Sequence, residues 1–284
     1  MADFILAEGL SLDYVKQRRG SLFKALFSSR RETVSAVRDV SFSIGEGEAV
    51  GLAGTNGAGK STLLKVLLGI LAPTSGEVSV MGCDPFKNRR DNAYKTGVVF
   101  GHRSQLWWDL PVSDSFGLLK KIYKVPDDVF RQNLSYAKEH LGIGSLWDVP
   151  VRQLTPGQRA LAEVGAATVH GPRLLILDEP ASGIDIPARR RILGFIKRLN
   201  SERDATVIMA THYMNDVDEL CGRVILIDLG SIVADMPLGA FRQRYSGQRT
   251  IKVDLNAPLA EFSTEGATAS PRSGGLTWSF RLEP

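Results

Sequence analysis

The sequence predicts an α/β fold with a mainly parallel sheet, an antiparallel β subdomain, an inserted helical subdomain and a small C-terminal β-like tail. Short apolar runs alternate with amphipathic stretches along most of the chain, which is typical of strands that alternate with helices. One run, RLLILDE at residues 173–179, is too continuous for a half-exposed strand and belongs in the middle of a parallel sheet. We place the main domain at residues 1–246 and the tail at residues 247–284.

The composition is that of an ordinary globular protein, with 43% hydrophobic and 23% charged residues. The net charge of +4 is small for 284 residues, so we expect no nucleic-acid partner. No run approaches the roughly 18 consecutive apolar residues of a membrane-spanning helix. The N-terminal residues carry acids and no basic leader, unlike a secretory signal. We therefore expect a cytoplasmic protein that reaches a membrane only through a partner.

Two strands are expected near the N-terminus, over residues 4–14 and 37–44. Between them, residues 18–31 are basic and place Leu and Phe side chains on one face of a short helix. This insertion is either a solvated surface element or a contact with anionic lipid or a membrane partner.

The remaining elements follow in order along the chain. We expect strands at residues 49–54, 76–82, 96–101, 173–179 and 206–212, and a hairpin at 223–236 that turns near Leu229 and Gly230. Helices are expected at residues 60–71, from about 112 to 142, from Pro156 onwards, and at 187–202, with a helical subdomain at about 105–165. The tail carries two short alternating segments, 250–255 and 276–282, which form either a β-appendage or a loosely held end.

The strongest motif joins the strand that ends at Gly54 to the helix that begins at Lys60, and it matches GxxxxGK[ST]. Glycines let the backbone aim successive N–H groups at phosphate oxygens, and the helix N-terminus adds partial positive charge. Lys60 supplies a cation for the β- and γ-phosphates, and the Ser61 hydroxyl can coordinate Mg²⁺. The motif predicts ATP and Mg²⁺ as cofactors, held by Gly54, Thr55, Asn56, Gly57, Ala58, Gly59, Lys60, Ser61 and Thr62.

Two later strands end in residues that complete such a site. Asp178 follows a buried strand and can hold Mg²⁺ directly or through water. Glu179 is then placed to orient the attacking water or accept its proton. His212 ends the next strand and can hydrogen-bond the γ-phosphate. We expect Glu179 and His212 to be catalytic and Asp178 to be a metal ligand.

In this order, a P-loop, a strand ending in Asp-Glu and a histidine after the next strand resemble the ATP-binding-cassette (ABC) family, over about residues 4–245. The resemblance implies a P-loop NTPase core that hydrolyses ATP. It also implies two ATPase subunits arranged head to tail, as a homodimer or a heterodimer. The long separation between Lys60 and Asp178 leaves room for the helical subdomain of that family.

The LSGGQ segment of the family corresponds here to LTPGQ, with Thr155, Pro156, Gly157 and Gln158 in its last four places. The segment also fits a helix start, because Thr155 can be the N-cap, Pro156 fits the first helical position and Gln158 completes a capping box. Either Thr155 and Gly157 grip the γ-phosphate of ATP bound to the other subunit, or the helix is well capped and its grip is weakened, because Pro156 lacks an N–H.

Three further positions are carried over from the family. Ser182 to Asp185 resembles the SALD loop that crosses the dimer interface, although a simple helix cap before Pro187 is the alternative. The family has a glutamine, that of the Q-loop, after the strand at 96–101, and His102 occupies this position here. His102 can bind the γ-phosphate or a water on Mg²⁺. The alternatives are that Gln105 takes this role or that the position is purely structural. Tyr14 matches the aromatic that stacks on adenine, or it is a half-buried strand tyrosine.

Residues 101–116 and the basic insertion resemble ATPases that work with ABC-2-type permeases, most of which are exporters. Trp107 and Trp108 lie where the coupling helix of such a permease docks, and they are either interface anchors or part of the helical core. We therefore expect an ATPase subunit that energises an exporter from the cytoplasmic face of the plasma membrane. A soluble ABC ATPase acting on DNA or ribosomes, or a P-loop kinase, are the alternatives.

Overall fold

A computed structural model describes residues 3–17, 31–101, 103–245, 250–254, 257, 267–272 and 277–282. The chain divides into two compact units, residues 1–235 and 236–284. The division between an ATPase domain and a tail at residues 246–247 stays a prediction. The helix expected at 18–31 lies outside the described residues, except that residue 31 begins a strand.

The first unit is built on a six-stranded sheet with the order β5-β6-β7-β3-β8-β9. Strands β5, β6, β7, β3 and β8 are parallel neighbours, which confirms the predicted parallel sheet and the central position of residues 174–178. All five residues of β3 and all six of β7 are buried. The strands are β3 (Ala49–Ala53), β5 (Thr96–Phe100), β6 (Leu174–Asp178), β7 (Thr206–Thr211), β8 (Arg223–Asp228) and β9 (Ser231–Pro237).

A second, antiparallel sheet has the order β2-β1-β4, as expected for the β subdomain. Its strands are β1 (Ile5–Gln17), β2 (Arg31–Ile44) and β4 (Ser75–Val80), and the first two are longer than the sequence predicted. Helix α1 (Lys60–Leu67) shares one buried apolar core with both sheets, because Leu63 and Leu67 pack with Ile5, Ile44 and Ile208. The helix was predicted to reach residue 71, but it ends at Leu67. Shortly after this end, Gly69 adopts a left-handed φ of 68°, which is common after the last turn of a helix.

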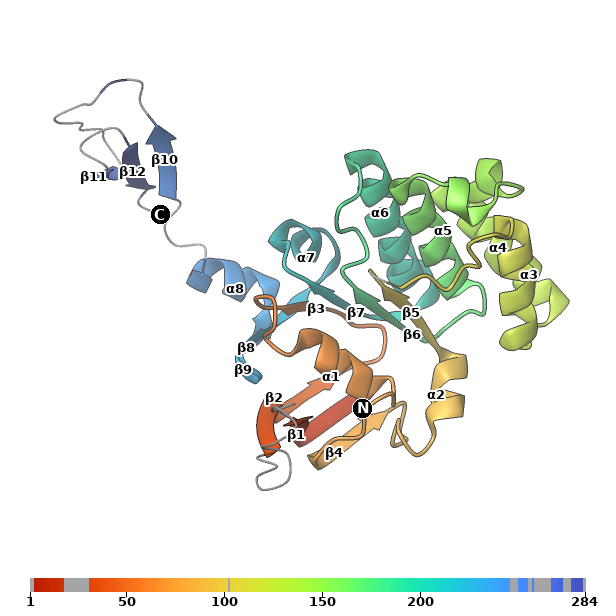
Figure 1. Ribbon diagram of the computed structural model, residues 1–284, viewed down its shortest axis with the longest axis horizontal. Helices are drawn as coiled ribbons and strands as arrows, with labels where there is room; N and C mark the ends of the chain where they lie inside the picture. The colour runs from red at the N-terminus through yellow and green to blue at the C-terminus, as the bar shows by residue number, and fades with distance from the viewer. Residues whose placement is uncertain are drawn as a thin grey trace, which may run out of the picture. The chain divides into compact units, whose positions relative to one another are not determined.

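Helices α3, α4 and α5 gather at the end of the first unit opposite the antiparallel sheet (Figure 1). The pattern expected over residues 112–142 forms two helices, because Lys124 adopts a left-handed φ of 52° that ends the first, and Pro126 then precedes the second. Helices α2 and α7 were not predicted. The helices are α2 (Arg89–Lys95), α3 (Val112–Ile122), α4 (Asp127–Leu141), α5 (Pro156–Thr168), α6 (Ile186–Arg203) and α7 (Met214–Leu220), with short 3-10 turns at Ile143–Leu146 and Val151–Gln153.

The second unit contains helix α8 (Leu238–Tyr245) and a three-stranded antiparallel sheet with the order β10-β12-β11. Strands β10 (Thr250–Asp254) and β12 (Thr277–Leu282) match the two predicted segments, and β11 (Ala267–Arg272) was not predicted. Of the two interpretations of the tail, the structure therefore supports a β-appendage. Within the described ranges, no helix is both long enough and apolar enough to cross a membrane.

Candidate nucleotide-binding site

The loop between β3 and α1 has a backbone that only glycine can adopt at two positions. Gly54 has a φ of 155° and Gly59 a φ of 109°. A Cβ atom on Gly54 would lie 2.3 Å from the carbonyl oxygen of Ile227, and one on Gly59 would lie 2.4 Å from that of Ala36. Such distances are far below van der Waals contact, so both positions require glycine. The loop therefore delivers its N–H groups to the N-terminus of α1, where anions bind well.

Lys60 is the first residue of α1, and only 7% of it is exposed. Its ammonium donates to the carbonyl oxygens of Gly54 at 2.7 Å and of Thr55 at 3.0 Å. An ammonium has three protons, so one is left for a further acceptor. The positive charge is therefore held against the backbone of the loop.

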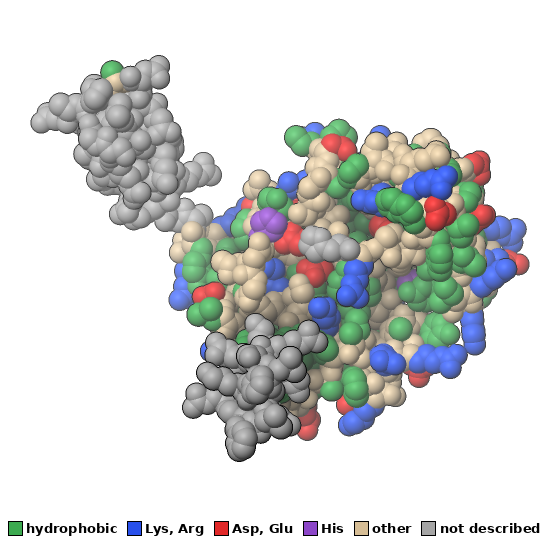
Figure 2. All heavy atoms as spheres, in the orientation of Figure 1, with side chains coloured by type: hydrophobic (Ala, Val, Ile, Leu, Met, Phe, Trp, Pro, Cys, Tyr) green, Lys and Arg blue, Asp and Glu red, His purple; other side chains and the backbone are tan. Residues whose placement is uncertain are grey.

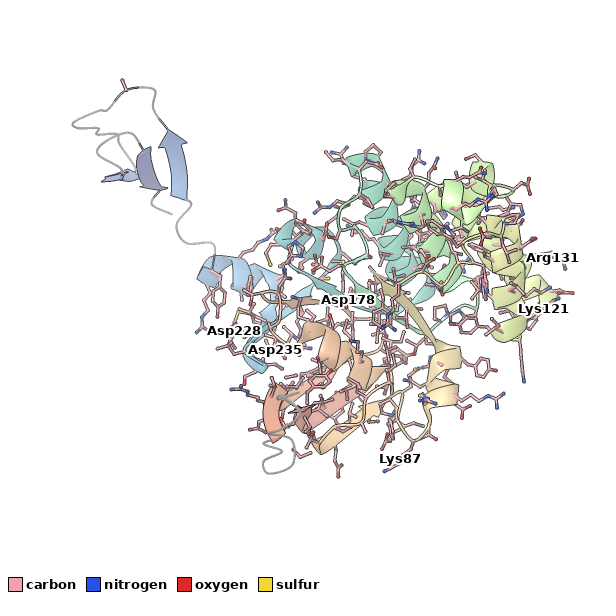
Figure 3. All side chains as sticks on the ribbon, in the orientation of Figure 1. Lys87, Lys121, Arg131, Asp178, Asp228 and Asp235 are labelled. Atoms are coloured by element: carbon pink, nitrogen blue, oxygen red, sulfur yellow. The ribbon has the colours of Figure 1, made fainter. Side chains whose placement is uncertain are left out.

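A cavity of about 400 Å³ opens over this loop. Residues 56–62 line one side, and Asp178, Glu179 and Arg103 line the other. Figure 3 labels Asp178 near the middle of the first unit, with Lys87, Lys121 and Arg131 at the edge. The hydroxyl of Ser61 and the carboxylate of Asp178 are oxygen ligands of the kind that Mg²⁺ prefers, and they share this cavity. The chemistry of these two groups thus fits the expected metal.

Glu179 is held in an unusual backbone conformation beside His212. Its φ of 54° lies in the left-handed region, which costs a non-glycine residue about 1 kcal/mol or more. The backbone N–H of Glu179 donates to Ala210 at 2.9 Å. Its Oε1 accepts hydrogen bonds from the backbone N–H of His212 at 3.1 Å and from Nδ1 of the same residue at 2.7 Å. The Glu179 carboxylate and the His212 ring therefore form one unit at the edge of the sheet.

A second set of side chains supports His212, and sequence reasoning missed it. The His212 ring lies 3.9 Å from the Tyr213 ring, and the Arg189 guanidinium lies over Tyr213 at 5.2 Å. Arg189 also donates to Asp216, with Nη2 at 2.6 Å and Nε at 2.7 Å from Oδ1. Burial raises the pKa of Asp216, and Arg189 opposes this rise. The available signal was spacing, because Arg189 and Asp216 each follow a predicted site residue by four positions.

Three further residues were assigned by resemblance to the family, namely Tyr14, His102 and Gln105. The Tyr14 hydroxyl lies 3.4 Å from that of Thr62 in α1, so Tyr14 stands beside the loop with 39% of its surface exposed. His102 lies outside the described residues. Gln105 does not turn toward the cavity, because its side-chain amide donates to the backbone carbonyl of Glu163 at 3.1 Å.

The start of α5 confirms the predicted capping box. The Thr155 hydroxyl accepts from the Gln158 backbone N–H at 3.2 Å, and the Gln158 side chain accepts from the Thr155 N–H at 2.9 Å, with Pro156 at the first helical position. In the described part of the chain, the N–H of Gly157 has no acceptor. One backbone donor of this segment is therefore unused within the described chain.

Asp185 is the N-cap of α6, since its Oδ1 accepts from the backbone N–H of Ala188 at 2.8 Å. It also touches the start of α5, because a Cβ on Gly157 would lie 2.3 Å from Asp185 Oδ2. Ser182 is exposed in the loop before it. The LTPGQ segment and the SALD-like loop are thus in contact, an arrangement that their distance in the sequence did not reveal.

Trp107 and Trp108 are exposed, at 38% and 53% of their surface. Their exposure supports a role as anchors in an interface rather than a place in the core of the helical subdomain. Figure 2 shows acidic, basic and histidine side chains gathered near the middle of the drawn face of the first unit.

A phosphate-binding loop, an Asp-Glu pair and a histidine at one edge of a parallel sheet define an ATPase of the ABC type, and sequence comparison agrees. A sequence model of the family described as ABC transporter matches residues 37–182. The chain belongs to this family. It is an ABC ATPase, the ATP-binding subunit of a transporter. ATPase domains of this family dimerise and work with membrane permeases.

Among curated proteins, the chain is 30% identical over 230 residues to the ABC transporter ATP-binding protein NatA of Bacillus subtilis (strain 168), which covers 81% of this chain and 91% of NatA. It is 34% identical over 198 residues to the linearmycin resistance ATP-binding protein LnrL of the same organism, covering 70% of this chain and 63% of LnrL. It is 30% identical over 216 residues to the methionine import ATP-binding protein MetN 2 of Enterococcus faecalis, covering 75% and 62%. The chain thus spans less than two thirds of the length of LnrL and MetN 2.

Solved structures share the fold. A dimeric post-hydrolysis state of the ATP-binding cassette MJ0796, bound to ADP and Pi, superposes with a TM-score of 0.70 at 23% identity, covering 82% of this chain and 98% of that one. The cbiO1 subunit of Clostridium perfringens, part of the ABC transporter complex cbiONQ, gives a TM-score of 0.70 at 26% identity, covering 87% and 93%.

Proposed function

We propose that this ATPase energises an exporter whose membrane-spanning part is a separate ABC-2-type permease. Two features support this proposal. Residues 101–116 resemble ATPases of that class, and both tryptophans of this segment are exposed. The relatives include a resistance protein, but they also include a methionine importer, so the direction of transport needs its own test. In this proposal the subunit lies on the cytoplasmic face of the plasma membrane, bound to its permease.

The observation that carries the proposed chemistry is one cavity that brings residues 56–62 of the loop together with Asp178 and Glu179. Lys60 and the loop N–H groups bind the β- and γ-phosphates. Ser61 and Asp178 hold Mg²⁺, which neutralises charge on the phosphates. Glu179 orients the attacking water and accepts its proton, so that ATP and water give ADP and phosphate.

His212 supports both Glu179 and the phosphate. Its Nδ1–H donates to the carboxylate of Glu179, and Nε2 donates to the γ-phosphate when both ring nitrogens carry a proton. His102 contributes from the Q-loop slot, to the γ-phosphate or to a water on Mg²⁺. Tyr14 stacks on the adenine, beside Thr62.

The ATP is shared between two subunits, as a homodimer or a heterodimer. Thr155, Pro156, Gly157 and Gln158 face the nucleotide of the other subunit, and the free N–H of Gly157 is the donor that this role requires. Ser182 and Asp185 cross the interface beside them. Because the nucleotide contacts both faces only in the closed dimer, ATP favours closure and hydrolysis releases it.

The ATP site is tested by two substitutions in the purified chain. Lys60→Ala removes the buried cation and should weaken nucleotide binding at least tenfold, which is about 1.4 kcal/mol. Glu179→Gln keeps the size of the side chain but removes the base, so it should retain binding and lose at least about 99% of turnover. Unchanged ATPase activity in either variant contradicts the assigned roles.

The permease is tested by tagging Glu179→Gln, expressing it in its native host, solubilising the membranes with Mg-ATP and identifying what co-purifies. A membrane protein with several spans and the ABC-2-type sequence supports the proposal. Inverted vesicles that carry this permease with the wild-type ATPase then separate export from uptake, because with Mg-ATP outside an exporter fills them and an importer empties them. A ribosomal or DNA-bound partner, with nothing from the membrane, contradicts the transporter proposal, and a phosphorylated acceptor in place of free phosphate contradicts ATP hydrolysis.

A further inference from the structure

The segment that follows β5 is tied to a buried carboxylate. Glu163 lies about two turns into α5 and is only 9% exposed. Its Oε1 accepts a hydrogen bond from the Ser104 hydroxyl, and its Oε2 accepts one from the Gln105 backbone N–H at 3.1 Å. The Gln105 side chain donates to the backbone carbonyl of Glu163, and Ser104 in turn accepts from the Leu106 N–H at 3.1 Å. One residue of α5 therefore holds three consecutive residues of the segment.

The two elements joined in this way lead to different surfaces. Helix α5 begins at the LTPGQ segment, and residues 161–169 behind that start are all buried. The segment after Leu106 continues into the exposed Trp107 and Trp108. Arg159 lies one turn before Glu163 on the same face of α5, and its guanidinium lies over the Trp108 ring at 5.5 Å. The helix thus holds the segment at two points.

Close packing alone does not hold residues 103–108 against helix α5. A cavity of about 370 Å³ is lined by Ser104, Arg159 and Glu163 on one side and by Glu179 and Ser182 on the other. On this side the segment is therefore not enclosed by packed side chains. The hydrogen bonds of Glu163 are specific contacts that tie it to α5 there. Burial raises the pKa of Glu163, and the bonds from Ser104 and Gln105 oppose this rise.

We propose that Glu163 is a positioning residue that fastens residues 103–108 to helix α5, so that both move as one body when the dimer closes. Closure acts on the first turn of α5, and the fastened segment carries that movement to the two exposed tryptophans. The proposal rests on the proposed function, which places ATP at the first turn of α5 and a permease at Trp107 and Trp108.

Amide hydrogen exchange of the full chain tests this, with and without Mg²⁺ and a non-hydrolysable ATP analogue. In Glu163→Ala, amides 104–106 should exchange roughly tenfold faster than in the wild type, because a bond to the charged carboxylate is lost. The analogue should still protect residues 54–62 and 155–158 in this variant, but it should no longer protect 103–108. Glu163→Gln keeps an acceptor for the Gln105 N–H and a group that can bond Ser104, so it should restore the protection.

The matched control is Glu139→Ala, which removes an exposed carboxylate from the neighbouring helix α4 and should behave as the wild type. Equal nucleotide-dependent protection of 103–108 in Glu163→Ala and the wild type overturns the proposal. A parallel loss of protection in β7 also overturns it, because general destabilisation would then explain the result. A wild-type chain without nucleotide-dependent protection of 54–62 would overturn the ATP site itself, and this proposal with it.

Discussion

At the scale of single residues, the site combines local strain with dense hydrogen bonding. Glu179 keeps a left-handed φ because Ala210 binds its N–H and His212 binds its carboxylate twice. Strain of this kind persists only where surrounding contacts determine it, and it is common at functional sites. Lys60 is fixed in the same way by the carbonyl groups of its own loop. The reacting groups are therefore positioned by short contacts to the backbone.

His170 gives a pH-dependent prediction at this scale. Burial lowers the pKa of His170 from 6.5 to about 4, and the ring stacks on Tyr123 at 4.0 Å with Nδ1 buried and without a partner in the described chain. Because the folded state favours the neutral ring, this contribution to stability is complete above pH 6.5. It is lost as the pH falls through about 4, and it amounts to on the order of 3 kcal/mol.

The phenylalanine variant checks this prediction, because it keeps the stacking and cannot titrate. Between pH 6.5 and pH 4, the free energy of unfolding measured with urea should fall more steeply for the wild type than for His170→Phe. The difference between the two proteins should change by on the order of 3 kcal/mol across this window. Parallel profiles would show that the ring is not held in its neutral form.

At the scale of elements, helix termini place the residues that we assign to the dimer interface. Thr155 caps α5 and Asp185 caps α6, and the two caps touch through Gly157. The same residues thus fulfil a local role in capping and a proposed role between subunits. Because a cap alone would produce the same sequence pattern, the sequence could not separate these roles.

Thr155 tests whether capping and phosphate contact can be separated. Thr155→Ala removes the hydroxyl and should lower the free energy of unfolding by about 1 kcal/mol, whereas Thr155→Ser should retain it. If the hydroxyl also grips the phosphate, Thr155→Ala should lower kcat of the dimer well beyond its effect on stability. Urea unfolding and ATPase assays on both variants measure this, and equal kcat values for Ala and Ser would limit Thr155 to capping.

The ion pair between α6 and α7 yields a prediction with a control on the same helix. Arg189→Met leaves the carboxylate of Asp216, whose side chain is 3% exposed, without a cation and should cost about 3 kcal/mol of stability. Arg198→Met breaks an exposed pair with Glu202 and should cost about 0.5 kcal/mol or less. If both substitutions lower the free energy of unfolding by the same amount, the buried ion pair stabilises the protein no more than the exposed one.

At the scale of the whole molecule, the sequence predicted what local patterns encode. The P-loop, the buried strand before Asp178 and the alternation of strands and helices in the core follow from motifs and periodicity, and the structure has them in the predicted places, although helices α2, α7 and α8 were missed. Contacts between distant positions were not predictable. The bonds of Glu163 to residues 58 and 59 positions away, and the pair of Arg189 and Asp216 27 positions apart, depend on how helices pack. Strand β11 was missed because it contains Pro271, which weakens a strand pattern.

The central claim is that two copies of an ABC ATPase, or this chain and a related one, enclose ATP between the loop at 54–62 of one subunit and the LTPGQ segment of the other. The most direct test is the molar mass of purified Glu179→Gln, measured by light scattering with and without Mg-ATP. We expect the mass to double with Mg-ATP and to return to that of a single chain when Lys60→Ala is added to the same variant. If only a heterodimer forms, doubling should require the related subunit that co-purifies with the permease. If Mg-ATP leaves the mass unchanged, both for this chain alone and for this chain with that subunit, ATP is not enclosed between two subunits.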